Sequence, residues 1–432
     1  MTVRPDTAAA LLAEVAGAQS DSRLPSMTAG VVRDGELVWT GARGRFADRG
    51  GLLPGADVQY RIGSITKTLT AVLVMQCRDD GLLSLSDPIG KHLPGIGYGD
   101  LTVRNLLAHS GGMNAEPIGA WWERHPGVSF QELATAIDES AAAGEPDRRH
   151  HYSNLGYAML GELVARLRGA PWFELVQQRI LDPLELRRTS YLPQQPAAQG
   201  FSVHPWTGRL DDEPAYDAGA MGPAGQLWST VEDLARYAAF WIDPVSEVLG
   251  KDTVEEMAAP QASDPGEALT ASYGLGLRLH ADDPHLFVGH TGSMPGFLAG
   301  LFVDRARRIG AVTMANGTAG RCPSVARDLL RTLVSYEPVL APEWIPEPEL
   351  SEGKDLLGHW YWGNTPFLIS VSNGNLQLSG DEQSRFLPAG PDLYTGQDGY
   401  FAGEKLRVVR DGADIRHLDL ATFVLTRSPY GG

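Results

Sequence analysis

The chain has 432 residues, of which 43% are apolar and 21% are charged, as in globular proteins with sizeable cores, and its length predicts two or three domains. Its net charge of −17 argues against nucleic acid and anionic membranes as partners, because both repel an acidic surface. The two cysteines, Cys77 and Cys322, are too few for a disulfide framework.

The N-terminal stretch 1–26 shows no basic segment followed by an uninterrupted apolar core, and no run reaches 18 apolar residues. Such features would indicate a secretion signal or a membrane helix. The cytoplasm is therefore the expected compartment, which disfavours a role in cell-wall chemistry outside the membrane.

Residues 1–337 are predicted to hold strands at both ends and helices between them, an α+β layer architecture. A hairpin is expected over 27–39, because Asp34-Gly35 between two β-prone runs is typical of a type I′ turn. Apolar spacing predicts helices over 7–18, 65–80, 101–109, 130–143, 155–167, 231–240 and 322–336, and strands over 273–279, 286–290, 297–304 and 309–315.

The C-terminal part is predicted to be a separate domain. Residues 338–353 begin with four prolines in eleven positions, which favours a semi-rigid extended linker. Beyond them, residues 354–432 show short alternating runs separated by turn residues, typical of a small β-barrel or sandwich.

The strongest chemical signal is Ser64-Ile-Thr-Lys67. Ser64 is expected to open a helix, where backbone N–H groups favour developing negative charge. Lys67 follows one helical turn later and can reach the serine oxygen, provided that burial lowers its pKa enough for it to accept a proton. Ser351-Glu-Gly-Lys354 has the same spacing but lies in the expected linker, so context favours the first match.

Tyr152-Ser-Asn154 is a second element, because a phenol near a cation can ionise and relay a proton to a leaving group while the amide holds a substrate carbonyl. Taken alone, Ser64 can equally be a helix cap and Tyr152 a core aromatic. What favours a functional reading is that these residues occur together and in order with the next element.

His290-Thr-Gly292 follows an expected strand, so His290 is predicted to face the nucleophile while Gly292 permits close backbone approach. The backbone N–H groups of Ser64 and Ser293 would then form an oxyanion hole. The alternative is that His290 is an ordinary strand histidine with satisfied hydrogen bonds.

The three elements resemble the motifs of class C β-lactamases, penicillin-binding proteins and the related esterases and D-aminopeptidases. The stretches 60–64, 106–112 and 224–230 resemble that family too, over roughly residues 10–336. The resemblance implies an antiparallel sheet flanked by helices with an all-helical subdomain. The tail from Gly358 resembles the lipocalin-like barrel domain appended to some members, including thioesterases that release and cyclise nonribosomal peptides.

One departure is that β-lactamases usually carry lysine at the position of His290, and a neutral imidazole does not supply that fixed charge. This disfavours efficient penicillin hydrolysis and favours the esterase, D-peptidase or thioesterase branches. His290 is also expected to set part of the acidic limb of the pH–rate profile.

Two further residues are weaker candidates for substrate contact. Glu232, three residues after Ser229, forms a capping box or, by the resemblance, holds an attacking amine. Arg427 either ends a solvated strand or reaches the cleft. The sequence contains no G-x-S-x-G elbow, and His280–His285 lacks a recognised metal spacing.

The chain is therefore predicted to be a serine hydrolase or acyltransferase without metal or cofactor, acting on a small or peptidyl acyl substrate that is either free or presented by a carrier protein. Ser64 would be acylated, Lys67 would take its proton and Tyr152 would protonate the leaving group. The specific hypothesis is a thioesterase that macrocyclises a nonribosomal peptide with D-residues. The alternatives are a water-using esterase or D-peptidase and a non-catalytic binding protein.

Overall fold

The computed structural model describes residues 2–46, 53–263, 266, 270–283, 285–338, 340, 343, 352–380 and 383–430. The chain divides into two compact units, Met1–Val339 and Leu340–Gly432, each with its own buried apolar clusters. Most positions of the expected linker 338–353 lie outside the described residues.

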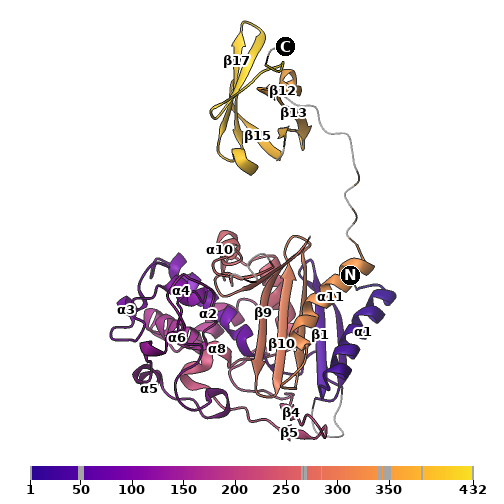
Figure 1. The fold of residues 1–432 in the computed structure, drawn as a ribbon. Helices are drawn as coiled ribbons and strands as arrows, with labels where there is room; N and C mark the ends of the chain where they lie inside the picture. The colour runs from indigo at the N-terminus through magenta and orange to yellow at the C-terminus, as the bar shows by residue number, and fades with distance from the viewer. Residues whose placement is uncertain are drawn as a thin grey trace. The chain divides into compact units, whose positions relative to one another are not determined.

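The larger unit is built on an antiparallel sheet that has, within the described ranges, seven strands in the order β2-β1-β11-β10-β9-β8-β7 (Figure 1). N-terminal and C-terminal strands meet in its centre, where Val31 lies opposite Ala311. The strands are β1 (Ser26–Arg33), β2 (Glu36–Gly44), β7 (Ala271–Tyr273), β8 (Arg278–Asp282), β9 (His285–Met294), β10 (Phe297–Asp304) and β11 (Ile309–Ala315).

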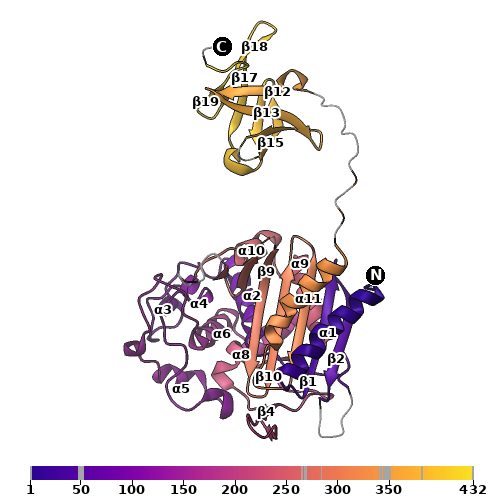
Figure 2. The same ribbon diagram turned by 45° about the vertical axis from the view of Figure 1, so that its right-hand side comes forward.

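Both faces of this sheet are covered, because successive strand residues point in opposite directions. Val31 and Phe302 pack in one buried cluster with α1 (Pro5–Asp21) and α11 (Cys322–Tyr336), two helices that lie side by side over the sheet (Figure 2). Their neighbours Val32 and Val303 pack on the opposite side with α9 (Val231–Ile242).

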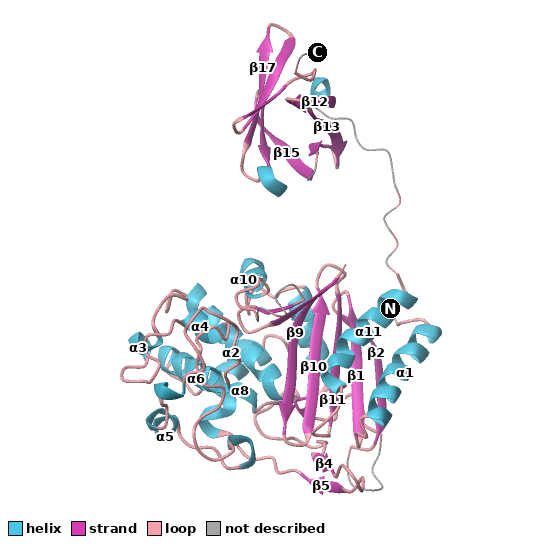
Figure 3. Ribbon diagram, viewed as in Figure 1, coloured by secondary structure: helices cyan, strands magenta, loops and turns pink. Residues whose placement is uncertain are grey.

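The chain between β2 and β7 is mostly helical, and its helices gather beside the β9 side of the sheet (Figure 3). They are α2 (Thr66–Asp79), α3 (Ile89–His92), α4 (Val103–Leu107), α5 (Phe130–Thr135), α6 (Asn154–Arg168), α7 (Trp172–Val176), α8 (Gly222–Gly225) and α10 (Lys251–Met257). Two short strand pairs, β3 (Tyr60–Arg61) with β6 (Trp228–Ser229) and β4 (Phe201–Val203) with β5 (Leu210–Asp212), join this region. The expected α+β class, with its helical subdomain, is confirmed.

The predicted hairpin at 27–39 is confirmed, since Asp34 and Gly35 both have positive φ, +50° and +83°, as a type I′ turn requires. The predicted strand 273–279 is wrong. The chain turns there, with the Gly274 N–H bonded to the Leu277 carbonyl (2.8 Å), so Leu275 and Leu277 are buried turn residues rather than strand residues.

The predicted helix 130–143 is too long. A capping box between Ser129 and Glu132 starts α5, but the Asp138 carboxylate accepts from the Ser140 N–H and begins a separate 3₁₀ turn. Local side-chain capping therefore interrupts a helical apolar pattern. The helix predicted over 101–109 likewise ends at Leu107, before His109 with φ +55°.

The smaller unit is a meander of antiparallel strands in chain order from β12 to β19. Tyr361 and Thr426 exchange two backbone hydrogen bonds of 2.7 and 2.9 Å, which bring the first and last strands together into a nearly closed barrel, as the sequence predicted. The strands are β12 (Gly358–Trp362), β13 (Thr365–Ser372), β14 (Asn375–Ser379), β15 (Gln383–Gly390), β16 (Leu393–Gly396), β17 (Lys405–Asp411), β18 (Asp414–Leu420) and β19 (Phe423–Leu425).

No helix within the described ranges is long and apolar enough to cross a lipid bilayer.

The barrel core predicts a selective loss of stability. Trp360 is fully buried, its indole N–H donates to the Leu356 carbonyl at 2.7 Å, and the Arg427 guanidinium lies 3.9 Å from its ring centroid. Trp360→Ala should cost about 3–5 kcal/mol of unfolding free energy and lower the melting transition of Leu340–Gly432 in scanning calorimetry. The transition of Met1–Val339 should stay in place.

Trp362→Ala is the matched control, because this tryptophan of the same strand is 48% exposed and should cost much less. Equal losses from the two substitutions would contradict the assignment of the core.

Candidate active site

Ser64 lies in a single 3₁₀ turn, Gly63–Ile65, that leads into α2 at Thr66. The helix itself thus begins two residues after the serine, slightly later than the sequence predicted. Gly63 has φ +51°, and a side chain there would meet the Ser293 backbone nitrogen at 2.5 Å, so a glycine is required. Ser64 is partly exposed and can be reached from solvent.

Lys67 is fully buried and its Nζ makes three contacts that draw separate parts of the chain together. It lies 2.9 Å from Ser64 Oγ, 2.6 Å from Asn154 Oδ1 and 2.6 Å from the Ala224 carbonyl oxygen. Burial lowers the pKa of Lys67 to about 7, although nearby carboxylates favour its charged form. A large fraction of the amine is therefore uncharged at neutral pH and able to accept the Ser64 proton.

The Tyr152 ring lies between two cations, with Lys67 Nζ 5.0 Å and the Arg278 guanidinium 5.4 Å from its centroid. Its hydroxyl oxygen is buried, and its interaction with Ser64 favours the ionised form. Burial raises the pKa of this phenol, and the opposing effects of Arg278 and Ser64 are smaller. Burial therefore favours the protonated phenol, which is suited to donate a proton, and the relay through an ionised Tyr152 stays a prediction.

His109 packs against the Tyr152 ring. Its ring centroid lies 4.2 Å from that of Tyr152, and its Nδ1 accepts the Ser153 N–H at 3.1 Å. The stretch 106–112, which resembles the family in sequence, thus helps to hold the phenol in place.

His290 lies in β9 but does not present a free nitrogen to the nucleophile. Its Nδ1 lies 2.5 Å from the Thr291 carbonyl, which can only accept, and its Nε2 lies 2.8 Å from the Tyr273 hydroxyl. Burial, together with Arg278 and Lys67, holds the pKa of His290 well below its usual range. Both ring nitrogens of His290 are thus engaged within the protein, which disfavours a contribution of this residue to the acidic limb; that His290 sets part of the limb stays a prediction.

Gly292 brings β9 against the turn that carries the nucleophile. A side chain there would lie 1.9 Å from the Ile62 carbonyl oxygen, just as one at Gly63 would meet the nitrogen of Ser293. The Ser293 backbone nitrogen thus lies beside the Ser64 turn, where an oxyanion donor is required.

Two carboxylates missed by the sequence analysis act on Lys67. Glu116 Oε1 accepts from Asn154 Nδ2 at 2.6 Å, so Asn154 links this carboxylate to Lys67. Glu123 is half-buried, and burial raises its pKa. Both favour the charged form of Lys67, and the indoles of Trp122 and Trp121 donate to Glu116 and Glu123 at 2.8 and 2.9 Å.

Arg278 was missed as well. It begins β8, directly opposite Gly289 of β9, and its charge lowers the pKa of Lys67 and His290. Its Nε has no hydrogen-bond partner within the described part of the chain. The site therefore keeps a cation on its sheet side despite the histidine at position 290.

Glu232 is exposed on the first turn of α9. The capping interpretation was misplaced by one residue, because Thr230, not Ser229, is the cap and accepts from the Asp233 N–H at 3.2 Å. Among the described residues, no hydrogen bond joins the Glu232 side chain to the groups around Lys67.

Arg427 belongs to the smaller unit and is engaged there. Its guanidinium donates to the carbonyls of Leu357 (3.0 Å) and His359 (3.3 Å) and to that of Asp355. These contacts explain its place in the barrel and give no support for a contact with substrate.

A serine beside a buried lysine of lowered pKa, with a protonated phenol and a backbone N–H close to the same turn, defines a serine-nucleophile enzyme of the β-lactamase and penicillin-binding-protein fold. Residues 9–334 match the family model described as Beta-lactamase, and the chain belongs to this family. Residues 349–427 match the model of a domain of unknown function, DUF7586.

Known proteins resemble the chain along most of its length. Beta-lactamase-like protein 2 of Dictyostelium discoideum is 26% identical, over 95% of this chain and 82% of that protein. The D-stereospecific amidohydrolase from Streptomyces sp. is 26% identical with a TM-score of 0.62, over 77% of this chain and 99% of the other. The penicillin-binding protein homologue from Pyrococcus abyssi, 23% identical, shares the fold with a TM-score of 0.69, over 96% and 99%.

The charges around Lys67 predict opposite shifts of the acidic limb of kcat/KM. The limb should have its midpoint near the Lys67 pKa of about 7, since only the neutral amine accepts a proton. Glu116→Gln removes a charge that favours the ammonium form, so the midpoint should fall. Arg278→Gln removes a charge that disfavours this form, so the midpoint should rise.

Hydrolysis of a p-nitrophenyl ester across pH measures these midpoints, with His290→Gln as the comparison that should leave the midpoint unmoved. If the midpoint shifts in His290→Gln but not in Glu116→Gln or Arg278→Gln, the acidic limb reports the titration of His290 and not that of Lys67.

Proposed function

We propose that the chain transfers acyl groups through an ester on Ser64. Lys67 takes the Ser64 proton as Oγ attacks the substrate carbonyl, and the N–H groups of Ser64 and Ser293 stabilise the oxyanion. Tyr152 then protonates the leaving group as its bond to the acyl carbon breaks, and the proton held by Lys67 returns to the Tyr152 oxygen. The observation that carries this proposal is the 2.9 Å contact between Ser64 Oγ and a buried amine whose pKa is about 7.

The acyl donor in this proposal is a D-configured amino acid or peptide with a free amino group. Glu116 and Glu123 provide negative charge next to the nucleophile, which suits an ammonium group. The 26% identity to a Streptomyces D-stereospecific amidohydrolase, nearly all of whose length is covered, supports the D-configuration. Water would then release the acid as the product.

The second candidate is a thioesterase that releases a D-residue-containing nonribosomal peptide as a macrocycle, with the thioester presented on a carrier protein. The same carboxylates favour it, because they can hold the peptide's own amine beside the acyl carbon. An acyl-enzyme separates the two half-reactions, so water and an amine compete for one intermediate.

Covalent labelling tests the nucleophile. A fluorophosphonate should add once per chain, as read by intact mass, and Ser64→Ala should remove the adduct. Lys67→Ala should slow labelling by about 10²–10⁴-fold through loss of the base. The matched control is Ser351→Ala, which alters the second Ser-x-x-Lys spacing of the chain and should label normally. Labelling that survives Ser64→Ala would refute the proposal.

Product analysis tests the substrate. D-amino acid amides with a free amine should be turned over faster than their L-isomers, and Glu116→Gln should lower kcat/KM for free amines by about 10–100-fold while sparing N-acetylated substrates. Glu232→Gln, which tests the exposed alternative, should have no effect. With peptidyl N-acetylcysteamine thioesters, a cyclic product supports the thioesterase, and a linear acid alone supports the hydrolase.

A further inference from the structure

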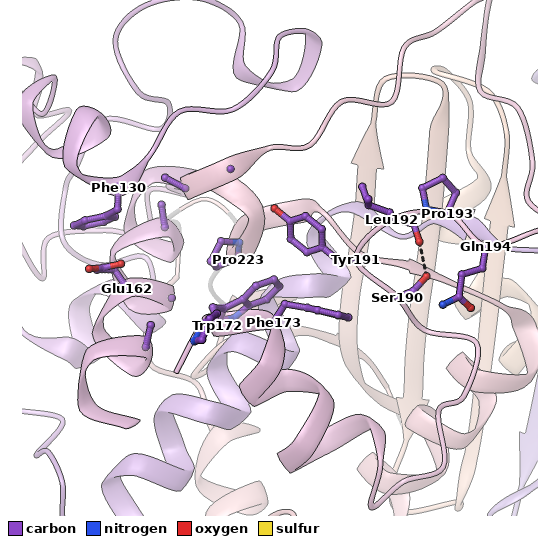
Figure 4. A pocket seen from close by; sticks show the side chains of 16 residues that line it. Phe130, Glu162, Trp172, Phe173, Ser190, Tyr191, Leu192, Pro193, Gln194 and Pro223 are labelled. Carbon is purple, nitrogen blue, oxygen red and sulfur yellow. Dashed lines mark hydrogen bonds between the residues drawn. The ribbon is translucent and has the colours of Figure 1, made fainter. Parts of the chain in front are cut away.

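A cavity of about 700 Å³ lies in the helical region, between α6, α7 and the segments 190–194 and 219–223 (Figure 4). Aromatic side chains form much of its wall. They are Phe130, Trp172, Phe173 and Tyr191. Neither Ser64 nor Tyr152 is among the lining residues, so this cavity is distinct from the nucleophile's surroundings.

Most charged and polar side chains in the wall have partners within the protein, whereas the uncharged amide of Gln194 accepts, among the described residues, only from Arg188 at 3.5 Å. Glu162 pairs with Arg166 at 2.7 Å, the Tyr191 hydroxyl donates to Asp217, and the Trp172 indole donates to Thr70 Oγ1 at 3.1 Å. A charged ligand would lose hydration without gaining a partner, whereas an uncharged aromatic one gains apolar and ring contacts. The volume is that of pockets for molecules of a few rings.

One wall of the cavity is connected to Lys67. Pro223 lines the cavity, and its carbonyl accepts from Thr70 Oγ1 at 2.9 Å. The next residue, Ala224, gives its carbonyl to Lys67 Nζ. Pro223 is also pressed against α6, since a Cβ at Gly161 would lie 2.1 Å from the proline ring. A ligand that contacts Pro223 can therefore shift the segment whose Ala224 carbonyl binds the Lys67 amine.

We propose that this cavity is a second binding site, for an uncharged aromatic small molecule, and that its occupation changes the reactivity of Ser64 through Pro223 and Ala224. The ligand does not compete with the acyl substrate, because the two sites are separate. Binding itself does not depend on the proposed acyl chemistry.

The probe is N-phenyl-1-naphthylamine, an uncharged aromatic whose fluorescence rises in apolar surroundings, titrated into the full chain. Ala165→Phe, at a partly exposed cavity position of α6, should weaken binding at least about tenfold. Ala16→Phe, at a comparably exposed position of α1, is the matched control and should bind normally. Leu192→Trp is a second variant at the 55% exposed rim, where folding is least affected.

Binding should persist after fluorophosphonate has modified Ser64, and saturating probe should change the labelling rate of the free enzyme severalfold. Three results would each overturn the proposal: no fluorescence rise, equal affinity in both cavity variants and the control, or loss of binding on labelling of Ser64. A rise that is lost instead in Trp362→Ala would place the probe in the barrel and also overturn it.

Discussion

The burial of the Lys67 amine is the constraint on which the arrangement of the active site depends. An ammonium group without water is strongly disfavoured, and three oxygen acceptors at 2.6–2.9 Å offset this cost only in part. The result is a base whose pKa is close to neutrality. Because the acceptors come from the Ser64 turn, α6 and α8, the position of this single side chain ties together segments that are far apart in sequence.

The surroundings of the amine balance opposite charges. Glu116 and Glu123 favour its ammonium form, while Arg278 and burial favour the neutral one. On the sheet side, Gly63 and Gly292 allow two stretches of backbone to touch, which brings the Ser293 backbone nitrogen beside the Ser64 turn, where the proposed oxyanion hole lies. Such preorganised donors need no rearrangement when charge develops.

Much of this arrangement could be predicted from the sequence. The apolar pattern correctly indicated long elements such as β10, β11 and α11, because every residue of the two strands is buried and α11 has one buried face. The predictions of shorter elements were wrong where side-chain capping, as at Asp138, or a buried turn, as at Leu275, overrides the apolar pattern. The spacing of Ser64 and Lys67 located the centre of the site, since one helical turn determines their separation.

The remaining site residues carry no local signal. Glu116, Glu123 and Arg278 are brought to Lys67 by tertiary folding alone. The hydrogen bonds of His290 depend on Tyr273, which lies on β7, two strands away in the sheet. A motif identifies the residue type at position 290 but not which atoms around it are already satisfied.

The pairing of Tyr361 with Thr426 also limits how the smaller unit can meet other molecules. A sheet with a free border can recruit an extended peptide by backbone pairing, but the pairing of Tyr361 with Thr426 occupies part of that border. Recognition by this unit is therefore expected to rest mainly on side chains such as the exposed Trp362 and Tyr400. Its specificity can change by surface substitution without disturbing the hydrogen bonds that hold the barrel together.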